Sequence, residues 1–451
     1  MKKLFSLLLV LLVLGLVAGL SFLFFFKLEG QPPVLEKVVL KEPLGKKAQA
    51  TLVLFDKRSG LREVKIYLKQ GKQEKLLFER TYPVDIVWGS KTKAQELKVS
   101  FEPLKLGFRS GKARLIIAAR DASWRNGLKG NTLIWEKEVL LDLESPRIVV
   151  LSPIHYLVPG GSNLVVYKIS EPVRRQGVVI NGRSFTGYQL KEYPHKFFCL
   201  VALPIDQQEI SQMYVEAEDL AGNVSRLPVA YYVRKKRYRH DVINISDAFL
   251  KRKMPEFLER YPDIPRDDLL KAFIYVNTVL RQKNNQEITQ IAHHSKITEF
   301  YVDKPFLRLP KAATRALFGD HRTYYYHGRK IGTAVHLGLD WASIARAPVP
   351  AAATGKVIFA DYLGIYGNTI IIDHGLGLFT LYAHLAGFSV APGDLVKRGQ
   401  LIAYTDTTGL AGGDHLHFAV LVQGVFVEPI EWLDPHWVKT RILDKFKTPT
   451  P

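Results

Sequence analysis

H-L-G-L-D at residues 336–340 begins a stretch that also contains L-Y-A-H-L at 381–385 and H-L-H-F at 415–418. Five of the chain's thirteen histidines lie between His336 and His417. The glycine and the short apolar runs around these motifs favour extended chain over helix. Side chains two residues apart on a strand share a face. The two histidines of H-L-H therefore lie together, and so do His336 and Asp340.

Two neighbouring strands would bring three or four of these side chains into contact. Buried imidazoles that lie side by side need a polar partner or a metal. Neutral imidazole and carboxylate suit zinc, whose catalytic sites use three protein ligands and keep one position for water. The cluster therefore predicts a divalent metal site. His374 taken alone is interpreted as a structural histidine, because a backbone carbonyl satisfies a single buried imidazole.

The order of the motifs closely resembles that of the lysostaphin-type zinc metallopeptidases, which cut peptide bridges of bacterial peptidoglycan. The resemblance covers about a quarter of the chain, from Ala334 to Asp434. It rests on HLGLD, APVPAAATGKVIFA (347–360), YGNTIIIDHG (366–375), LYAHL, VAPGDLVKRGQLIAYT (390–405), TGLAGGDHLHF (408–418) and VEPIEWLD (427–434).

The resemblance implies a role for each motif residue. His336, Asp340 and His417 would hold Zn²⁺, and His415 and His384 would be the catalytic histidines that face the bound water and the oxyanion. The family often has glycine before the T-T-G turn, where this chain has Asp406, so we expect a different loop beside the cleft.

The N-terminus predicts a membrane anchor. Met-Lys-Lys precedes 23 uncharged residues, Leu4 to Phe26, which is long enough for a helix to cross a hydrocarbon core of about 30 Å. The two lysines place this end in the cytoplasm. The alternative is a cleaved signal peptide with a weak cleavage site at Val17-Ala18-Gly19. Because the apolar run continues past that point, an uncleaved anchor is favoured.

Residues 29–145 and 146–240 predict two β-sandwich domains, because short Val-, Ile- and Tyr-rich runs alternate with turn residues. The halves echo each other: ARLIIAARDASWRNGLKGN (113–131) and MYVEAEDLAGNVSRLP (213–228) each place a strand before an Asp-containing Gly-Asn turn. The second turn resembles the last hairpin of bacterial immunoglobulin-like domains. The single cysteine, Cys199, excludes an intrachain disulfide and is interpreted as a core residue.

Residues 241–300 predict a helical linker region. Ser246-Asp247 is a plausible N-cap, Pro265 could open a second helix, and an apolar stripe of helical spacing is expected to be core. The stripe consists of Leu269, Phe273, Val276 and Leu280. The basic stretch 234–240 is interpreted as a solvated linker in preference to a nucleic-acid contact. Tyr324, Tyr325, Tyr326 and His327 either line a substrate groove or form an ordinary hairpin.

Residues 301–440 predict an antiparallel β metallopeptidase domain, followed by a basic tail at 441–451. Strands are expected at 355–360, 368–373, 378–384, 400–405 and 415–422, with D-H-G-L-G (373–377) as a hairpin turn. The run at 390–400 also resembles biotinyl and lipoyl carrier domains. No lysine suited to modification lies at a hairpin tip, and a carrier has no use for the histidine cluster, so that alternative is disfavoured.

Taken together, the sequence predicts a mainly β, single-pass protein of the inner (cytoplasmic) membrane, with residues 1–28 as anchor and the bulk in the periplasm or outside. The predicted activity is zinc-dependent endopeptidase action on peptidoglycan cross-links. The alternative is a non-catalytic scaffold or activator of other cell-wall hydrolases. The net charge of +20 suits anionic lipid and wall polymers; no nucleic-acid motif accompanies it, so nucleic acid is not an expected partner.

Overall fold

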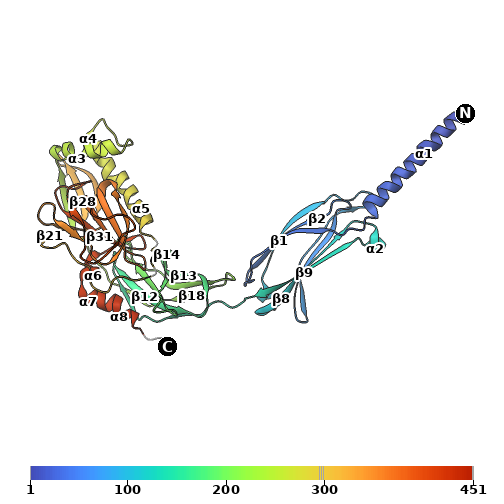
Figure 1. Cartoon of the computed structure of the whole chain (residues 1–451), viewed down its shortest axis with the longest axis horizontal. Helices are drawn as coiled ribbons and strands as arrows, with labels where there is room; N and C mark the ends of the chain where they lie inside the picture. Colours follow the sequence, from blue (N-terminus) through green and yellow to red (C-terminus); the bar gives the residue numbers. More distant parts are fainter. Residues whose placement is uncertain (1, 294, 296, 298, 449–451) are drawn as a thin grey trace. The chain divides into compact units, whose positions relative to one another are not determined.

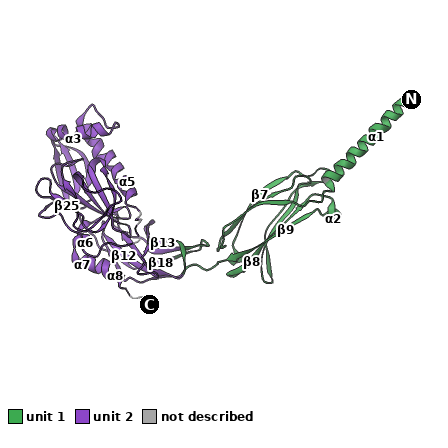
Figure 2. Cartoon of the chain, viewed as in Figure 1, with its two compact units in different colours: residues 1–146, 171–174, 218–225 green, residues 147–170, 175–217, 226–451 purple. Residues whose placement is uncertain are grey.

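The computed structural model describes residues 2–293, 295, 297 and 299–448 and divides the chain into two compact units (Figures 1 and 2). One unit runs to Pro146 and includes the short segments 171–174 and 218–225. The other contains residues 147–170 and 175–217 and the chain from Arg226 onward. Strands dominate both units, so the predicted mainly β fold class is confirmed.

The first unit begins with the predicted apolar helix. Helix α1 spans Lys2–Phe22 and continues as a π-helical turn, Leu23–Lys27. The stretch Lys3–Phe25 is long and apolar enough to cross a membrane, a property that a signal sequence near the N-terminus shares. Lys27 and Glu29, just beyond it, are buried against the strands that follow.

The rest of the first unit contains two antiparallel sheets around one core and a short two-stranded sheet, β5-β6. One sheet has the order β1-β2-β7 and the other β4-β3-β8-β9. Alternate residues of each strand face inward, as in Ala50, Leu52 and Leu54 of β2, which are fully buried. The strands are β1 (Val34–Leu40), β2 (Ala48–Phe55), β3 (Leu61–Gln70), β4 (Gln73–Thr81), β5 (Val84–Asp85), β6 (Gly89–Ser90), β7 (Ala94–Phe101), β8 (Gly111–Asp121) and β9 (Thr132–Leu141), with short helical turns at Pro103–Leu106 and Arg125–Leu128.

The second β-rich region also contains two four-stranded sheets, ordered β10-β12-β16-β15 and β14-β13-β17-β18. Cys199 is fully buried on β16, as predicted. The immunoglobulin-like assignment of both β regions stays a prediction. The strands are β10 (Ile148–Val150), β11 (His155–Leu157), β12 (Ser162–Ile169), β13 (Val173–Ile180), β14 (Arg183–Thr186), β15 (Tyr188–Gln189), β16 (Phe197–Ala202), β17 (Met213–Asp219), β18 (Val224–Pro228) and β19 (Tyr231–Val233).

The C-terminal domain contains a ten-stranded sheet whose main path is β21-β24-β31-β28-β27-β26-β29. The structure contains strands at all five predicted places, and the turn at 373–377 joins β27 to β28. The strands are β21 (Ala313–Ala316), β24 (Leu339–Ala342), β25 (Pro348–Pro350), β26 (Gly355–Tyr362), β27 (Asn368–Asp373), β28 (Leu378–Phe388), β29 (Leu395–Val396), β30 (Leu401–Thr405), β31 (Leu416–Val422) and β32 (Val425–Val427).

Short helical segments surround this sheet: η4 (Gly364–Tyr366), α6 (Pro429–Leu433), α7 (Pro435–Val438), η5 (Lys439–Leu443) and α8 (Asp444–Phe446). Within the second unit, the C-terminal domain and the second β region share one apolar core. Trp432, fully buried, donates its indole N–H to Ser162 Oγ at 3.2 Å. Residues 449–451 of the predicted basic tail lie outside the described residues.

The predicted helical region packs on the C-terminal sheet. Helix α3 (Asp247–Arg260) begins at Ser246, whose hydroxyl accepts from Phe249 N, as predicted. The second helix does not begin at Pro265: α4 (Leu269–Tyr275) is capped by Asp268, whose carboxylate accepts from two backbone N–H groups. The π-helical turn Val276–Leu280 and α5 (Arg281–Ile291) continue from α4.

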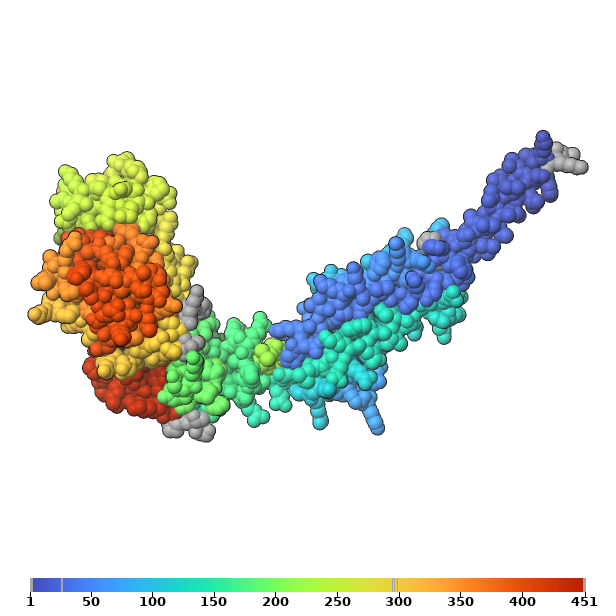
Figure 3. Space-filling model, viewed as in Figure 1, coloured from blue at the N-terminus to red at the C-terminus, as the bar shows by residue number. Residues whose placement is uncertain are grey.

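The apolar stripe of these helices is core, as predicted. Phe273 and Val276 are buried in the same cluster as Phe379 and Leu381 of β28. Figure 3 shows the atoms of the α3–α4 segment, in yellow-green, next to the orange atoms of the C-terminal domain. The helices therefore form part of the domain that carries the histidine cluster.

The basic stretch 234–240 is largely exposed and 234–239 has no regular secondary structure, as a solvated linker requires, but two of its side chains form ion pairs. Lys236 pairs with Glu428 at 2.6 Å, and Arg239 forms an ion pair with Asp320. Strand β20 (His240–Ile245) then runs parallel to β22 (His321–Tyr326), which forms a hairpin with β23 (Arg329–Val335). These basic side chains have buried acidic partners that lie far away in the sequence.

Candidate active site

Strand pairing brings the three predicted metal ligands together. Asp340 on β24 lies opposite His417 on β31 in the antiparallel register. His336 lies in the loop that joins β23 to β24. Asp340 Oδ1 is 2.9 Å from His336 Nε2 and 2.9 Å from His417 Nδ1, and the two imidazole nitrogens are 3.1 Å apart. All three residues are buried.

This triangle of donor atoms fits zinc. In a tetrahedral site with bonds of 2.0–2.1 Å, two ligand atoms lie roughly 3.3 Å apart, which is close to the distances here. His336 Nδ1 donates to the Leu317 carbonyl at 2.8 Å, so its Nε2 keeps a lone pair for a metal. His417 Nε2 is buried and has no hydrogen-bond partner among the described residues. The ligand set also matches the metal's preference for imidazole and carboxylate.

Electrostatics keep Asp340 ionised. Burial alone would raise the pKa of its carboxyl, but His336, His415 and His417 outweigh that effect and hold the pKa well below its usual range. Burial lowers the pKa of His417 to about 4. At neutral pH this pair is therefore a carboxylate and a neutral imidazole, the protonation states that a metal requires.

His384 and His415 present the same ring atom to one side of the triangle. Nδ1 of His384 is bonded to the Thr408 carbonyl at 2.8 Å, and Nδ1 of His415 to the Gly413 carbonyl at 2.8 Å. The two ring centres are 4.8 Å apart. Because Nδ1 is used in each case, Nε2 is the ring atom that remains for a ligand. In His415 this atom lies 3.6 Å from Asp340 Oδ1, and despite burial Asp340 raises the pKa of His415.

The backbone directs His384 into the cleft. Its φ is +60°, in the left-handed region that residues other than glycine rarely adopt. The strand pairing of β28 with β30 shifts register at this point, between Leu385 and Phe388. Burial and the neighbouring His415 and His417 lower the pKa of His384 well below its usual range. Its imidazole is therefore neutral.

Asp406 links the two catalytic candidates. Its backbone N–H donates to the His384 carbonyl at 2.8 Å, and it forms an isolated bridge with His415. Its side chain accepts from Thr407 N and lies 3.5 Å from Arg346. This residue stands where the resemblance leads us to expect glycine, and it forms part of the loop beside the cleft.

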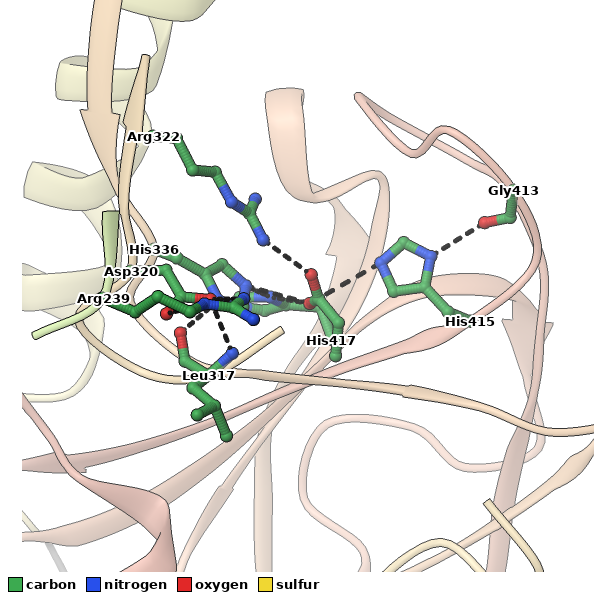
Figure 4. A network of polar contacts seen from close by, with 9 residues as sticks. Arg239, Leu317, Asp320, Arg322, His336, Gly413, His415 and His417 are labelled. Atoms are coloured by element: carbon green, nitrogen blue, oxygen red, sulfur yellow. Dashed lines mark hydrogen bonds and ion pairs between the residues drawn. The ribbon is translucent and has the colours of Figure 1, made fainter. Parts of the chain in front are cut away.

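Sequence reasoning missed Arg322. Its guanidinium donates to Asp340 Oδ2 at 3.0 Å, which leaves Oδ1 for the triangle (Figure 4). Further contacts hold the neighbouring Leu317 in place. Asp320 accepts from Leu317 N at 2.9 Å and pairs with Arg239. Leu317 in turn holds His336 through its carbonyl. Arg322 belongs to no motif, and no spacing in the sequence points to it.

A cavity of about 460 Å³ opens in front of the cluster. The histidines and Asp340 line one side, and helices α3, α4 and α5 contribute Phe249, Phe273 and Asn285 to the other. Tyr324 lines it too, with its ring 5.8 Å from that of Phe273. Tyr326 instead donates to Asp247 at 2.6 Å, and the largely exposed His327 occupies the hairpin turn.

His374 lies apart from the cluster and is satisfied. Nδ1 is bonded to the Thr354 carbonyl at 2.7 Å and Nε2 to Thr380 Oγ1 at 2.8 Å. Burial lowers its pKa to about 4. The structure thus places it as a neutral buried histidine, as its isolation in the sequence predicts.

Comparison with known protein families covers this same region: residues 334–429 match the profile of Peptidase family M23. The chain carries a C-terminal M23 peptidase domain. The match begins two residues before His336 and includes the three predicted ligands and the two predicted catalytic histidines: His336, Asp340, His384, His415 and His417. The resemblance to lysostaphin-type peptidases is thereby confirmed.

Each relative matches only part of this chain. The DD-carboxypeptidase/endopeptidase Mpg of Neisseria meningitidis serogroup B is 41% identical over 96 residues, 21% of this chain and 22% of that protein. The peptidoglycan DD-endopeptidase ShyB of Vibrio cholerae is 38% identical over 122 residues, 27% of each chain. The murein hydrolase activator EnvC of Escherichia coli is 39% identical over 85 residues, 19% and 20%. The chain therefore spans about a fifth to a quarter of the length of these relatives.

Proposed function

We propose that this protein is a zinc-dependent endopeptidase that hydrolyses peptide cross-links of peptidoglycan. The observation that carries the proposal is the buried triangle of His336 Nε2, Asp340 Oδ1 and His417 Nδ1, with two further imidazoles beside it. The names of Mpg and ShyB support the substrate class. A zinc ion held by the triangle would lower the pKa of a bound water to about 7 and polarise the scissile carbonyl.

His384 and His415 would take two different roles, proton transfer and stabilisation of the oxyanion. His384 or His415, in its neutral form, can accept a proton at Nε2 and return it to the leaving amine. The other donates a hydrogen bond to the oxygen on which negative charge develops. Because their Nδ1 atoms are held by backbone carbonyls, both rings keep their orientation during this exchange. Arg322 maintains the position of Asp340, so it acts as a positioning residue.

Metal content and product analysis test this proposal. We expect about one zinc per chain in the purified protein, lost on substitution of His336, Asp340 or His417 by alanine. His415→Ala should retain zinc and lose activity, while the exposed His327→Ala serves as the matched histidine control. With purified sacculi, cross-linked muropeptide dimers should fall and monomers rise, and a chelator should abolish the change.

The second candidate is an activator of other cell-wall hydrolases, as the name of EnvC suggests for that protein. The presence of all five motif residues favours the enzyme. If the muropeptide profile stays unchanged while an added amidase becomes faster, the activator function holds and the endopeptidase proposal fails. Full zinc retention in Asp340→Ala and His417→Ala would refute the ligand assignment.

We also propose that α1 stays in the inner membrane and holds the bulk of the protein in the periplasm. The uncharged run after Lys2 and Lys3 motivates this orientation. After carbonate extraction the protein should remain with the membrane, and protease added to spheroplasts should digest it. A soluble product lacking its first ~20 residues would instead identify a cleaved signal peptide.

A further inference from the structure

The first unit contains three acidic side chains that lie together in its interior. Glu29, Asp56 and Asp121 are 4%, 5% and 0% exposed, and each offers a carboxylate oxygen within 4.8 Å of the other two. Among the described residues, the ion pair that the structure shows for this trio is Arg58 with Glu29, at 4.0 Å. Three buried carboxylates with one distant guanidinium repel one another, and either protonation or a bound cation relieves that repulsion.

Two of the three carboxylates also accept hydrogen bonds from backbone N–H groups of the 56–60 turn. Asp56 Oδ1 accepts from the backbone N–H groups of Arg58 and Gly60, and Glu29 Oε1 accepts from Ser59 N. These hydrogen bonds involve one oxygen of each of the two carboxylates. They explain why carboxylates occur here, but they leave the mutual repulsion of the three groups in place. Burial also raises the pKa of Glu29 and of Asp56.

Ser59 is the second, independent feature. Its side chain is 1% exposed, and its Oγ has no hydrogen-bond partner among the described residues. Ser59 lies against Glu29, because its backbone N–H donates to Glu29 Oε1 at 2.8 Å. A buried hydroxyl that makes no hydrogen bond is costly. Its oxygen is therefore available as a ligand beside the three carboxylates.

We propose that Glu29, Asp56, Asp121 and Ser59 Oγ form a calcium-binding site where the N-terminal helix meets the first sandwich. All donors are oxygen atoms, which suit a hard divalent cation and not zinc. Ca²⁺ accepts irregular sets of six to eight oxygens, whereas Mg²⁺ demands near-octahedral geometry and keeps several waters. Since Glu29 follows the apolar helix and the aspartates lie on sandwich turns, bound calcium would tie the two together.

The same arrangement recurs at the start of the second β region, which explains the sequence echo between 113–131 and 213–228. Asp142, Glu171 and Asp219 again bring their oxygens within 4.8 Å of one another. In the first group Asn131 Nδ2 donates to Asp121 Oδ2 and to the Glu29 carbonyl. In the second Asn223 Nδ2 donates to Asp219 Oδ2 and to the Asp142 carbonyl. The proposal concerns the first group, where the buried hydroxyl is present.

Calcium binding by the full-length, zinc-loaded protein in detergent tests the site. Equilibrium dialysis against radioactive calcium should show saturable binding, with a Kd of about 10⁻⁴–10⁻³ M, typical of extracellular calcium modules. Glu29→Gln and Asp56→Asn each preserve a hydrogen-bond acceptor for the turn and should lose one equivalent of calcium. Asp85→Asn is the matched control, because Asp85 caps a turn of the same sandwich outside the trio.

The Ser59→Ala variant tests whether the Ser59 hydroxyl binds calcium or only supports the fold. Since Ser59 Oγ makes no hydrogen bond, this variant should melt at the same temperature as the wild type without calcium, and calcium affinity should fall several-fold. Magnesium should compete at least tenfold more weakly than calcium. The proposal is overturned if the wild type shows no saturable binding up to about 10 mM. It also fails if all three variants bind calcium as the wild type does, or if magnesium competes equally.

Discussion

Gly338→Ala tests whether the packing of the H-L-G-L-D motif, and not its ligands alone, sets the metal geometry. A Cβ built on Gly338 would lie 2.7 Å from both Cε1 and Nε2 of His417 and 2.7 Å from the Phe418 carbonyl oxygen. Phe418 is paired with Leu339 in the sheet, so its carbonyl has little freedom to move. The His417 ring or the 336–338 loop must therefore shift.

The size of that shift gives the expected effect. Ordinary contact to a Cβ requires about 3.4 Å or more, so the ring or the loop must move by roughly 0.7 Å. Metal–ligand distances tolerate a change of about 0.2 Å. We expect zinc affinity to fall about 10–100-fold, as for loss of a supporting residue around a metal site, or about 1.4–2.8 kcal/mol.

Competition with a chromophoric chelator measures this affinity directly. Gly387→Ala is the control, because a Cβ there meets no atom within 4 Å. Circular dichroism should show that both variants fold. A Gly338→Ala protein that holds zinc within twofold of the wild type would refute the steric argument.

Three further predictions follow from other contacts. Arg322→Met should lower zinc affinity about tenfold without unfolding the domain, because Asp340 loses the partner that orients it; the same chelator competition measures it. Burial raises the pKa of Glu431 to about 8, above its value in the unfolded chain, so native stability should decline as the pH rises from about 5 to 9. Glu431→Gln should flatten that decline, by a few kcal/mol at most, in melts recorded across this range. Trp432→Ala should cost about 3–5 kcal/mol in denaturant unfolding, since its side chain is fully buried.

Local patterns in the sequence predicted the elements that depend on local physics. The strands of the M23 domain follow from apolar runs between turn residues, and α3 begins at Ser246 because its hydroxyl can accept from the helix's first turn. The start of α4 shows the limit of this reasoning. Pro265 and Asp268 are both good start signals, and the carboxylate is the one that binds the free N–H groups.

Long-range contacts account for what the sequence did not predict. Arg322 reaches Asp340 only because the β22–β23 hairpin lies beside β24, and Lys236 reaches Glu428 across the domain. Asp121 was visible in the sequence as part of a Gly-Asn turn, and Glu29 and Asp56 were not singled out. Their burial against one another depends on how Glu29 returns to the sandwich after the helix, which no local pattern encodes.

The metal geometry and the hydrophobic core depend on the same strand register. On β31, Leu416 and Phe418 alternate with His417, and Phe418 stacks on Trp341 of β24 with ring centres 5.0 Å apart. A slip of one residue would turn every side chain of this strand to the opposite face. It would turn the imidazole into the apolar core and carry Phe418 away from Trp341, since both faces of this strand are buried. The apolar residues of H-L-H-F therefore hold His417 opposite Asp340, so the stability of the core and the position of the metal ligands cannot vary independently.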